Sequence, residues 1–308
     1  WLALRLRAAR LASGQRSGET YMCDQEQLAR WAKQALSRRT FGAGTLAGAA
    51  AACTPMGMEN TSGATSVTGR KVSFRTAAGT MDGEFFHPET GTHPGVIFWP
   101  DIAGIREAKR QMARRLAASG YAVLLVNPYY RDVTGEQFAD FATFAADKGF
   151  EKVKPWRDKL DAEAIQFDGR AATAWLLAQN AVDKSARIGT QGYCMGGPFT
   201  IWTAAAAPEV GAACSFHGGG LVREGENSPH RMLNADDHYL IAIAENDDAE
   251  QPEAKTALRN AASAVGAPAE IEVYPADHGW CVPDSPAYDR DAAEKAWSRL
   301  LATYSEAL

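Results

Sequence analysis

The sequence predicts an α/β fold in which a mostly parallel central sheet has helices on both faces. Short apolar runs recur from residue 95 onward, and most are followed by a segment with helical spacing of its apolar residues. Several of these runs are apolar throughout, which is typical of strands that are buried on both faces. The chain has 308 residues, of which 46% are hydrophobic and 22% are charged, so it can bury one large core.

The expected elements follow one another along the chain. Two short segments, 71–76 and 80–86, resemble a hairpin that opens the sheet. Further strands are expected at residues 95–99, 121–127, 186–191, 210–216, 238–244 and 270–274. Helices are expected at residues 106–119, 135–146, 160–180, 196–207, 252–265 and 289–304.

Glycine and proline residues justify several of these boundaries. Gly120 ends the first predicted helix. Pro128 ends the second apolar strand, because proline has no N–H group to donate within a sheet. Pro208 ends the fourth helix, and Pro252 opens the fifth, where its fixed φ suits the first turn. In sheets of this type, functional residues gather in the loops after the carboxyl ends of the strands.

The chain divides into a basic N-terminal extension and an acidic body. Residues 1–53 carry eight Lys or Arg and three Asp or Glu, whereas the whole chain has a net charge of −5. Residues 54–69 are small and polar, as is typical of a linker. A single domain is therefore expected over residues 70–308. Its acidity argues against nucleic-acid binding, which needs a basic surplus.

The extension contains a candidate export signal. Arg38 and Arg39 precede a weakly apolar run at 42–54, which is too short for a membrane span of about 20 residues but has the layout of a signal peptide. The Ser-Arg-Arg-x-Phe segment resembles the twin-arginine motif and predicts a periplasmic protein. The sequence before Cys53 resembles a degenerate lipobox, and lipidation there would tether the protein to a membrane. The alternative is an amphipathic helix with two incidental arginines in a cytoplasmic protein.

The strongest functional signal is the turn Gly-Tyr-Cys-Met-Gly-Gly at 192–197. It has the G-x-nucleophile-x-G pattern between a strand and a helix, with cysteine in place of serine. Gly192 and Gly196 are needed because the residues on either side of the nucleophile crowd each other. The turn would lift Cys194 to a helix N-terminus, where the helix dipole favours a thiolate. It would also direct the N–H group of Met195 at the reacting carbonyl.

A general base and an orienting carboxylate are expected after the nucleophile. His278 lies beside a glycine in the loop after the last strand, which suits a general base. Asp247 follows the preceding strand directly, so its carboxylate would lie on the rim of the site. Asp248 is the next candidate for the orienting carboxylate and Glu245 the third. His217 follows another strand and is expected to line the site.

Together these motifs resemble the dienelactone hydrolase family of carboxymethylenebutenolidase-like proteins, a Cys-His-Asp branch of the α/β-hydrolases. The resemblance runs from about residue 72 to the end of the chain. The motifs that carry it are GYCMGG at 192–197, AENDD at 244–248, YPADHGW at 274–280, PDIAGI at 100–105, YAVLLVNPYYR at 121–131 and FHGGG at 216–220. The resemblance implies the α/β-hydrolase fold and hydrolysis of a small-molecule lactone or carboxylic ester, with no metal or organic cofactor.

The resemblance also assigns roles to individual residues. Cys194 would attack the carbonyl, with the other two triad residues acting as base and orienting acid. The N–H groups of Ile102 and Met195 would form the oxyanion hole. Asp101 stands where the family has a glutamate that helps to convert the thiol into a thiolate. Aspartate is one methylene shorter, so either the backbone compensates or the activation step differs.

Dienelactone carries a carboxylate, so a cation is expected near the triad. Arg131, which follows two tyrosines, and Arg223, which follows the glycine run, are the candidates. Each has the alternative role of a solvated surface arginine. The oligomeric state is left open by the sequence, with a monomer as the simplest expectation.

Two other functions stay open at this point. One is an exported binding protein in which the triad is not used. The other is a thiol or redox protein in which Cys194 pairs with Cys214 or Cys281. The glycine-rich turn could also bind phosphate, and a buried cysteine is often only a packing residue. The complete order of nucleophile, acid and base favours hydrolysis.

Overall fold

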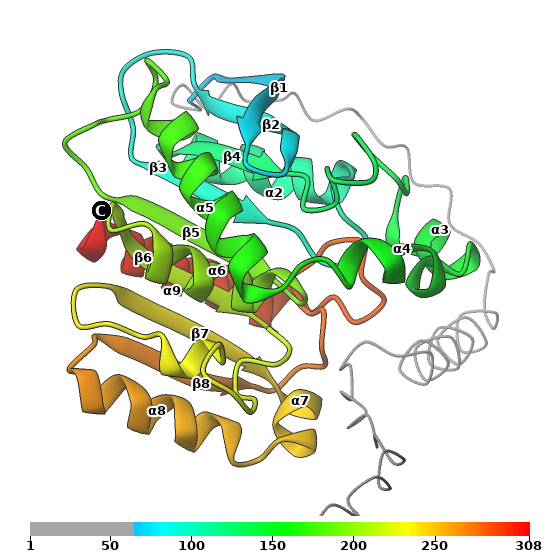
Figure 1. Cartoon of the computed structure of the whole chain (residues 1–308), viewed down its shortest axis with the longest axis vertical. Helices are drawn as coiled ribbons and strands as arrows, with labels where there is room; N and C mark the ends of the chain where they lie inside the picture. Colours follow the sequence, from blue (N-terminus) through cyan, green and yellow to red (C-terminus); the bar gives the residue numbers. More distant parts are fainter. Residues whose placement is uncertain (1–64) are drawn as a thin grey trace, which may run out of the picture.

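One eight-stranded sheet organises residues 65–308, which are the part of the chain that the computed structural model describes (Figure 1). The strands are β1 (Val67–Thr76), β2 (Gly79–Pro88), β3 (Gly95–Trp99), β4 (Ala122–Val126), β5 (Ile188–Tyr193), β6 (Val210–Phe216), β7 (His238–Ala244) and β8 (Ala269–Tyr274). Their order is β1-β2-β4-β3-β5-β6-β7-β8. β2 is antiparallel to both β1 and β4, and all other neighbours are parallel. The predicted mostly parallel sheet is therefore confirmed.

Helices connect most of the strands. They are α2 (Glu107–Ala118), α3 (Phe141–Ala146), α4 (Gly149–Arg157), α5 (Ala162–Leu177), α6 (Gly196–Ala206), α7 (Glu245–Glu250), α8 (Ala254–Val265) and α9 (Arg290–Ala307), with a short 3-10 turn η1 (Pro229–Arg231). Among the described residues, none of these helices has the length and apolar character needed to cross a bilayer. Residues 67–69, expected in the linker, belong to β1. The predicted export signal and Cys53 lie outside the described residues.

The prediction of one helix over 135–146 is wrong. α3 begins only after Asp140, whose carboxylate accepts a hydrogen bond from the N–H group of Thr143 (2.7 Å) and so caps the first turn. Lys148, with a left-handed φ of 56°, then separates α3 from α4, which the sequence patterns do not predict. α7 is also unpredicted. Its acidic residues look like a loop in the sequence, although acidic side chains suit the first turn of a helix.

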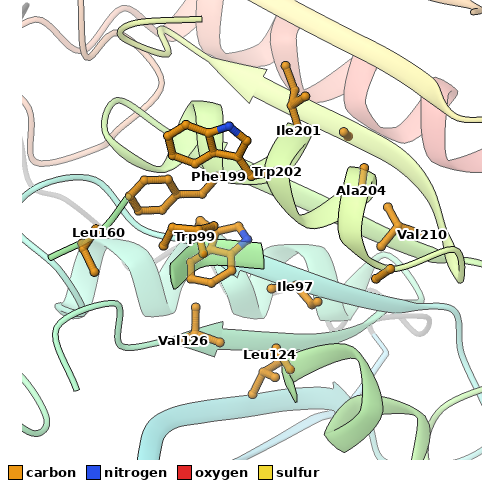
Figure 2. Packing of buried hydrophobic residues seen from close by; sticks show 14 of the residues in the cluster. Ile97, Trp99, Leu124, Val126, Leu160, Phe199, Ile201, Trp202, Ala204 and Val210 are labelled. Carbon is orange, nitrogen blue, oxygen red and sulfur yellow. The ribbon is translucent and has the colours of Figure 1, made fainter. Parts of the chain in front are cut away.

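Side chains of each central strand alternate between the two faces of the sheet. In β3, Ile97 and Trp99 belong to the apolar cluster beneath α5, α6 and α8, whereas Val96 and Phe98 belong to the cluster beneath α2 and α9. Figure 1 shows α5 and α6 in front of the sheet and α9 behind it. Figure 2 shows Trp99 beside Phe199 of α6, with ring centroids 5.6 Å apart. Both faces of the sheet are therefore packed against helices, and this packing fixes the positions of the strand ends.

The loops that carry the expected functional residues meet at one edge of this sheet. They follow the carboxyl ends of the parallel strands β3, β4, β5, β6, β7 and β8. In Figure 1, α3, α4, α7 and the orange loop after β8 all lie on this side of the molecule.

Candidate active site

Cys194 lies in the tight turn that joins β5 to α6. Its φ is 54°, a left-handed conformation that residues other than glycine rarely adopt and that is common at functional sites. Its N–H group donates to the carbonyl of Phe216 at the end of β6 (3.1 Å), and its own carbonyl accepts from the N–H group of Gly197 (3.0 Å). These bonds hold the strained residue in place and keep its side chain buried.

Two glycines make this turn sterically feasible. A Cβ atom on Gly192 would lie 1.9 Å from the carbonyl oxygen of Gly196. A Cβ atom on Gly196 would lie 2.6 Å from the carbonyl oxygens of Trp99 and Pro100. No side chain fits at either position. The second close approach also brings the start of α6 against the loop that follows β3.

The three residues predicted to form the triad lie together. Nδ1 of His278 lies 2.8 Å from Oδ2 and 3.1 Å from Oδ1 of Asp247, and both side chains are buried. The side chain of His278 also hydrogen-bonds that of Cys194. The backbone N–H group of His278 donates to Oδ1 of Asn246 (2.7 Å), so α7, directly after β7, holds both the backbone and the ring of His278. Asn246 is a positioning residue that the sequence patterns did not single out.

The electrostatics of this group favour a protonated imidazole. Burial alone would lower the pKa of His278, but the negative charges of Asp247 and Cys194, with a hydrogen bond to each, hold that pKa well above its ordinary value. A charged imidazole stabilises a neighbouring thiolate. The arrangement can therefore support a thiolate–imidazolium ion pair, which is the reactive form of a cysteine nucleophile.

The structure also distinguishes between the candidate carboxylates. Asp248 points to α8, where both of its oxygens lie 2.7 Å from Nζ of Lys255. Glu245 is exposed. Asp247, the first choice from the sequence, is the one that contacts His278.

Ile102 and Met195, the expected oxyanion-hole residues, lie on adjoining segments. Met195 stands immediately before α6, and Ile102 is buried in the loop after β3. The hydroxyl group of Tyr129 donates to the carbonyl of Ile102 (2.8 Å) and contacts Sδ of Met195 (3.4 Å). Tyr129 therefore links the two candidates. The sequence gives only its place at the carboxyl end of a buried strand as a signal for this role.

Asp101 is surrounded by cations. Its two carboxylate oxygens accept hydrogen bonds from the guanidinium of Arg106 (2.7 and 2.9 Å), and Oδ2 lies 2.7 Å from Nζ of Lys109. Burial would raise the pKa of Asp101, but the two cations hold it well below its ordinary value. Arg106 and Lys109 are absent from the sequence predictions. Cations near a helix N-terminus oppose the helix dipole, so their position before and within the first turn of α2 is a signal that they need anionic partners.

His217 lies against the triad. Its ring centroid is 4.8 Å from that of His278 and 5.1 Å from that of Trp280, and its φ is 40°. Burial, the positive charge of His278 and that of Lys109 hold its pKa well below the ordinary value, so its ring is neutral. Among the described residues, neither ring nitrogen has a hydrogen-bond partner. Such buried groups are costly unless something pairs with them.

The two candidate arginines have other partners. Arg131 forms a bidentate ion pair with the buried carboxylate of Asp168 on α5 (2.7 and 3.0 Å). Arg223 is exposed, lies over the ring of Trp202 (4.8 Å) and donates to the carbonyl of Gly220 (3.0 Å). These contacts tie both arginines to the scaffold.

Of the cysteine partners that a redox function would require, Cys214 is buried and Cys281 is partly buried. In residues 65–308 no two cysteines form a disulfide. Burial raises the pKa of Cys214 and also that of Cys281, which keeps both protonated at neutral pH. The same part of the chain contains no group of three or more His, Cys, Asp or Glu residues arranged to hold a metal ion.

Comparison with known proteins identifies the family of this chain. Residues 81–308 match the Dienelactone hydrolase family. A provisionally named carboxymethylenebutenolidase of Escherichia coli K12 is 30% identical over 223 residues, which cover 70% of this chain and 78% of the relative, and one from Salmonella typhi is 29% identical over 224 residues with the same coverage. The crystal structure of a provisionally named dienelactone hydrolase from Klebsiella pneumoniae has a TM-score of 0.66 and 25% identity, covering 78% of this chain and 99% of that one. This chain has the α/β-hydrolase fold and belongs to the dienelactone hydrolase family.

Proposed function

We propose that this protein hydrolyses a small, dienelactone-like lactone or carboxylic ester through a Cys-His-Asp triad. Family membership supports a hydrolase of the lactone or ester type. The observation that carries the finer proposal is the buried chain of contacts from Cys194 through His278 to Asp247. A binding protein would need none of these contacts.

In the first half of the reaction, the thiolate of Cys194 attacks the carbonyl carbon of the substrate. The carbonyl oxygen becomes an oxyanion, and the N–H groups of Ile102 and Met195 stabilise it. The bond between the carbonyl carbon and the alkoxy oxygen then breaks. The imidazolium of His278 gives its proton to the departing oxygen, and a thioester acyl-enzyme remains.

In the second half, water attacks the thioester. The now neutral His278 takes a proton from the water as the new C–O bond forms. The C–S bond then breaks, the carboxylic acid leaves, and the sulfur departs as a thiolate beside the imidazolium. Asp247 holds the ring in the same orientation throughout. Esters and lactones suit this chemistry because their leaving oxygen needs less assistance than an amide nitrogen.

His217 is the best supported substrate contact of the three that the sequence suggested. Its neutral ring can donate one hydrogen bond and accept another, and it lies beside His278. A polar group of a bound substrate would satisfy a nitrogen that has no partner among the described residues. Arg131 is already neutralised by Asp168, which argues for a structural role.

Turnover by the purified full-length chain tests the proposal. Dienelactone, a short-chain thioester and p-nitrophenyl acetate are offered with and without prior iodoacetamide treatment. Alkylation should remove turnover, and Cys194→Ala should lower kcat by at least about 10³-fold while circular dichroism stays unchanged. Mass spectrometry of the quenched reaction should find the acyl group on Cys194.

Cys281→Ala is the matched control, since it removes a thiol outside the triad and should keep its activity. Turnover that survives alkylation, or a Cys194→Ala variant with more than a few per cent of wild-type activity, would refute the nucleophile assignment. No turnover of any substrate, with Cys194 readily alkylated, would favour the thiol alternative.

A further inference from the structure

Four charged side chains form a cluster at the carboxyl end of the sheet. They are Asp101, Arg106, Lys109 and Asp284, and we call them the ion cluster. The side chains of Arg106 and Lys109 are completely buried, and that of Asp101 is 6% exposed. Two positive and two negative charges balance each other, so the cluster is neutral as a whole.

Arg106 occupies the centre of the cluster and uses both edges of its guanidinium. One edge donates to Oδ1 and Oδ2 of Asp101 (2.7 and 2.9 Å). The other edge, formed by Nε and a terminal nitrogen, donates to Oδ2 and Oδ1 of Asp284 (2.7 and 2.9 Å). Two bidentate contacts fix the guanidinium plane relative to both carboxylates, which a lysine at this position could not do.

The two carboxylates lie in loops of different function. Asp101 directly precedes Ile102, and its Oδ1 also accepts from the N–H group of Ala103 (3.0 Å), so it shapes the oxyanion loop at 101–105. Asp284 lies in the histidine loop at 278–285. It also accepts from the N–H group of Phe141 at the start of α3 (2.9 Å). Residues about 180 positions apart in the sequence are thus joined through one side chain.

Burial makes this link stiff. Exposed ion pairs of α2, such as that of Arg114 with Glu107, contribute little to stability because water screens them. Arg106 has no access to water, so releasing either carboxylate would cost the buried guanidinium one of its two bidentate partners with no water to replace it. The two loops are therefore expected to keep one relative position.

We propose that Arg106 is a positioning residue that fixes the oxyanion loop against the histidine loop. It keeps the N–H group of Ile102 and the ring of His278 directed at the same carbonyl group. The inference rests on the proposed hydrolysis, and it gives Asp101 the part of an anchor for the oxyanion loop. Arg106 touches neither substrate nor thiol in this role, and it acts only through the two loops.

Comparing two reactions of Cys194 tests this role. Ester hydrolysis requires the oxyanion hole, whereas alkylation by iodoacetamide requires only the thiolate. Arg106→Met should lower kcat for p-nitrophenyl acetate by about 100-fold, the loss expected for a displacement of about 1 Å, with KM within threefold. The rate of alkylation should stay within twofold of wild type.

Arg110→Met is the matched control, because Arg110 is on α2, the helix that Arg106 immediately precedes, and also binds two carboxylates, those of Glu84 and Glu136, away from the two loops. Its kcat should stay within twofold. Unchanged kcat in Arg106→Met would overturn the proposal, as would an equal loss of turnover and alkylation, because that would indicate damage to the triad itself.

Asp284→Ala serves if Arg106→Met does not fold, since Asp284 is 21% exposed and its loss leaves Arg106 paired with Asp101. Asp284→Asn should recover part of the activity, because its amide oxygen can still accept from Arg106. Hydrogen exchange provides a readout without substrate and so separates this proposal from the proposed function. Both loops, 101–105 and 278–285, should exchange faster in Asp284→Ala, and unchanged exchange would overturn the inference even in a protein with no esterase activity.

Discussion

The hydroxyl group of Tyr129 donates a hydrogen bond of 2.8 Å to the carbonyl oxygen of Ile102. The hydroxyl oxygen of Tyr129 also lies 3.4 Å from Sδ of Met195. Tyr129 follows β4, whereas Ile102 follows β3 and Met195 follows β5. One side chain from a third loop therefore connects the two residues proposed to stabilise the oxyanion.

Removing this hydroxyl group should slow the chemistry without weakening substrate binding. Tyr129→Phe keeps the ring, which packs on Trp156, and removes the hydroxyl group that contacts Ile102 and Met195. We expect kcat to fall about tenfold with little change in KM, less than the loss of a direct oxyanion donor. Steady-state kinetics with p-nitrophenyl acetate measure both. Tyr130→Phe is the control, since its hydroxyl group binds Asp168 and Thr76, and an equal fall there would contradict the assignment.

The raised pKa of His278 predicts how thiol reactivity depends on pH. Because Asp247 and Cys194 favour the imidazolium, wild-type Cys194 should react with iodoacetamide at pH values below the usual range of a thiol. In Asp247→Asn the negative charge is lost, the pKa of His278 falls, and the rise in alkylation rate should move to higher pH. Near pH 6 the alkylation rate of the variant should be about one tenth of the wild-type rate or lower.

Asp248→Asn provides the comparison for that experiment. Asp248 carries the same charge next in sequence but pairs with Lys255, so its profile should coincide with that of wild type. If the two variants shift the profile equally, the effect is one of general charge, and the orienting role of Asp247 is wrong.

Arg131 should matter for stability and not for substrate affinity. Among residues 65–308, Arg131→Met leaves the buried carboxylate of Asp168 with only the hydroxyl group of Tyr130 as a partner. We expect the free energy of unfolding to fall by about 3 kcal/mol, as for a broken buried ion pair. Urea denaturation measures the loss, and KM for a carboxylate-bearing lactone should stay constant. A rise in KM with an unchanged free energy of unfolding would contradict this prediction and indicate that Arg131 binds the substrate.

The assignment of Arg38 and Arg39 to an export signal remains a proposal. If the segment around Arg38 and Arg39 is a twin-arginine signal, replacing both with lysine should leave the protein in the cytoplasm. Fractionation of cells that express the wild-type chain and the double variant shows the difference. Replacing Arg5 and Arg7 instead keeps the change in composition but spares the motif, and should not alter the location. Normal export of the double lysine variant would refute the signal.

The sequence predicts the sheet well because a buried strand must be apolar. Short apolar runs such as GVIFW at β3 and HYLIAIA at β7 fit few structures other than a buried strand. Most of the predicted helices begin and end within a few residues of the observed helices. The region between β4 and α5 is different. There the cap at Asp140 and the left-handed Lys148 divide the chain, and neither has a periodic signal.

The turn around Cys194 can be predicted from the sequence for a steric reason, since the positions of Gly192 and Gly196 allow no side chain. The ion cluster cannot be predicted from the sequence in this way. Asp101 and Asp284 are far apart in sequence, and nothing local shows that Arg106 joins them. Spacing therefore predicts residue types that a turn requires, whereas long-range partners of charged groups depend on how the loops meet in three dimensions.

The order of the strands has a consequence for the chain before it is complete. Cys194 follows β5, but His278, the proposed base, follows β8, which is the last strand in the chain and an edge of the sheet. In the proposed mechanism, the contact between Cys194 and His278 requires β8 and the loop after it to be in place. The proposed reactivity of Cys194 therefore depends on the C-terminal part of the sheet, and the alkylation rate of Cys194 should report whether that part is folded.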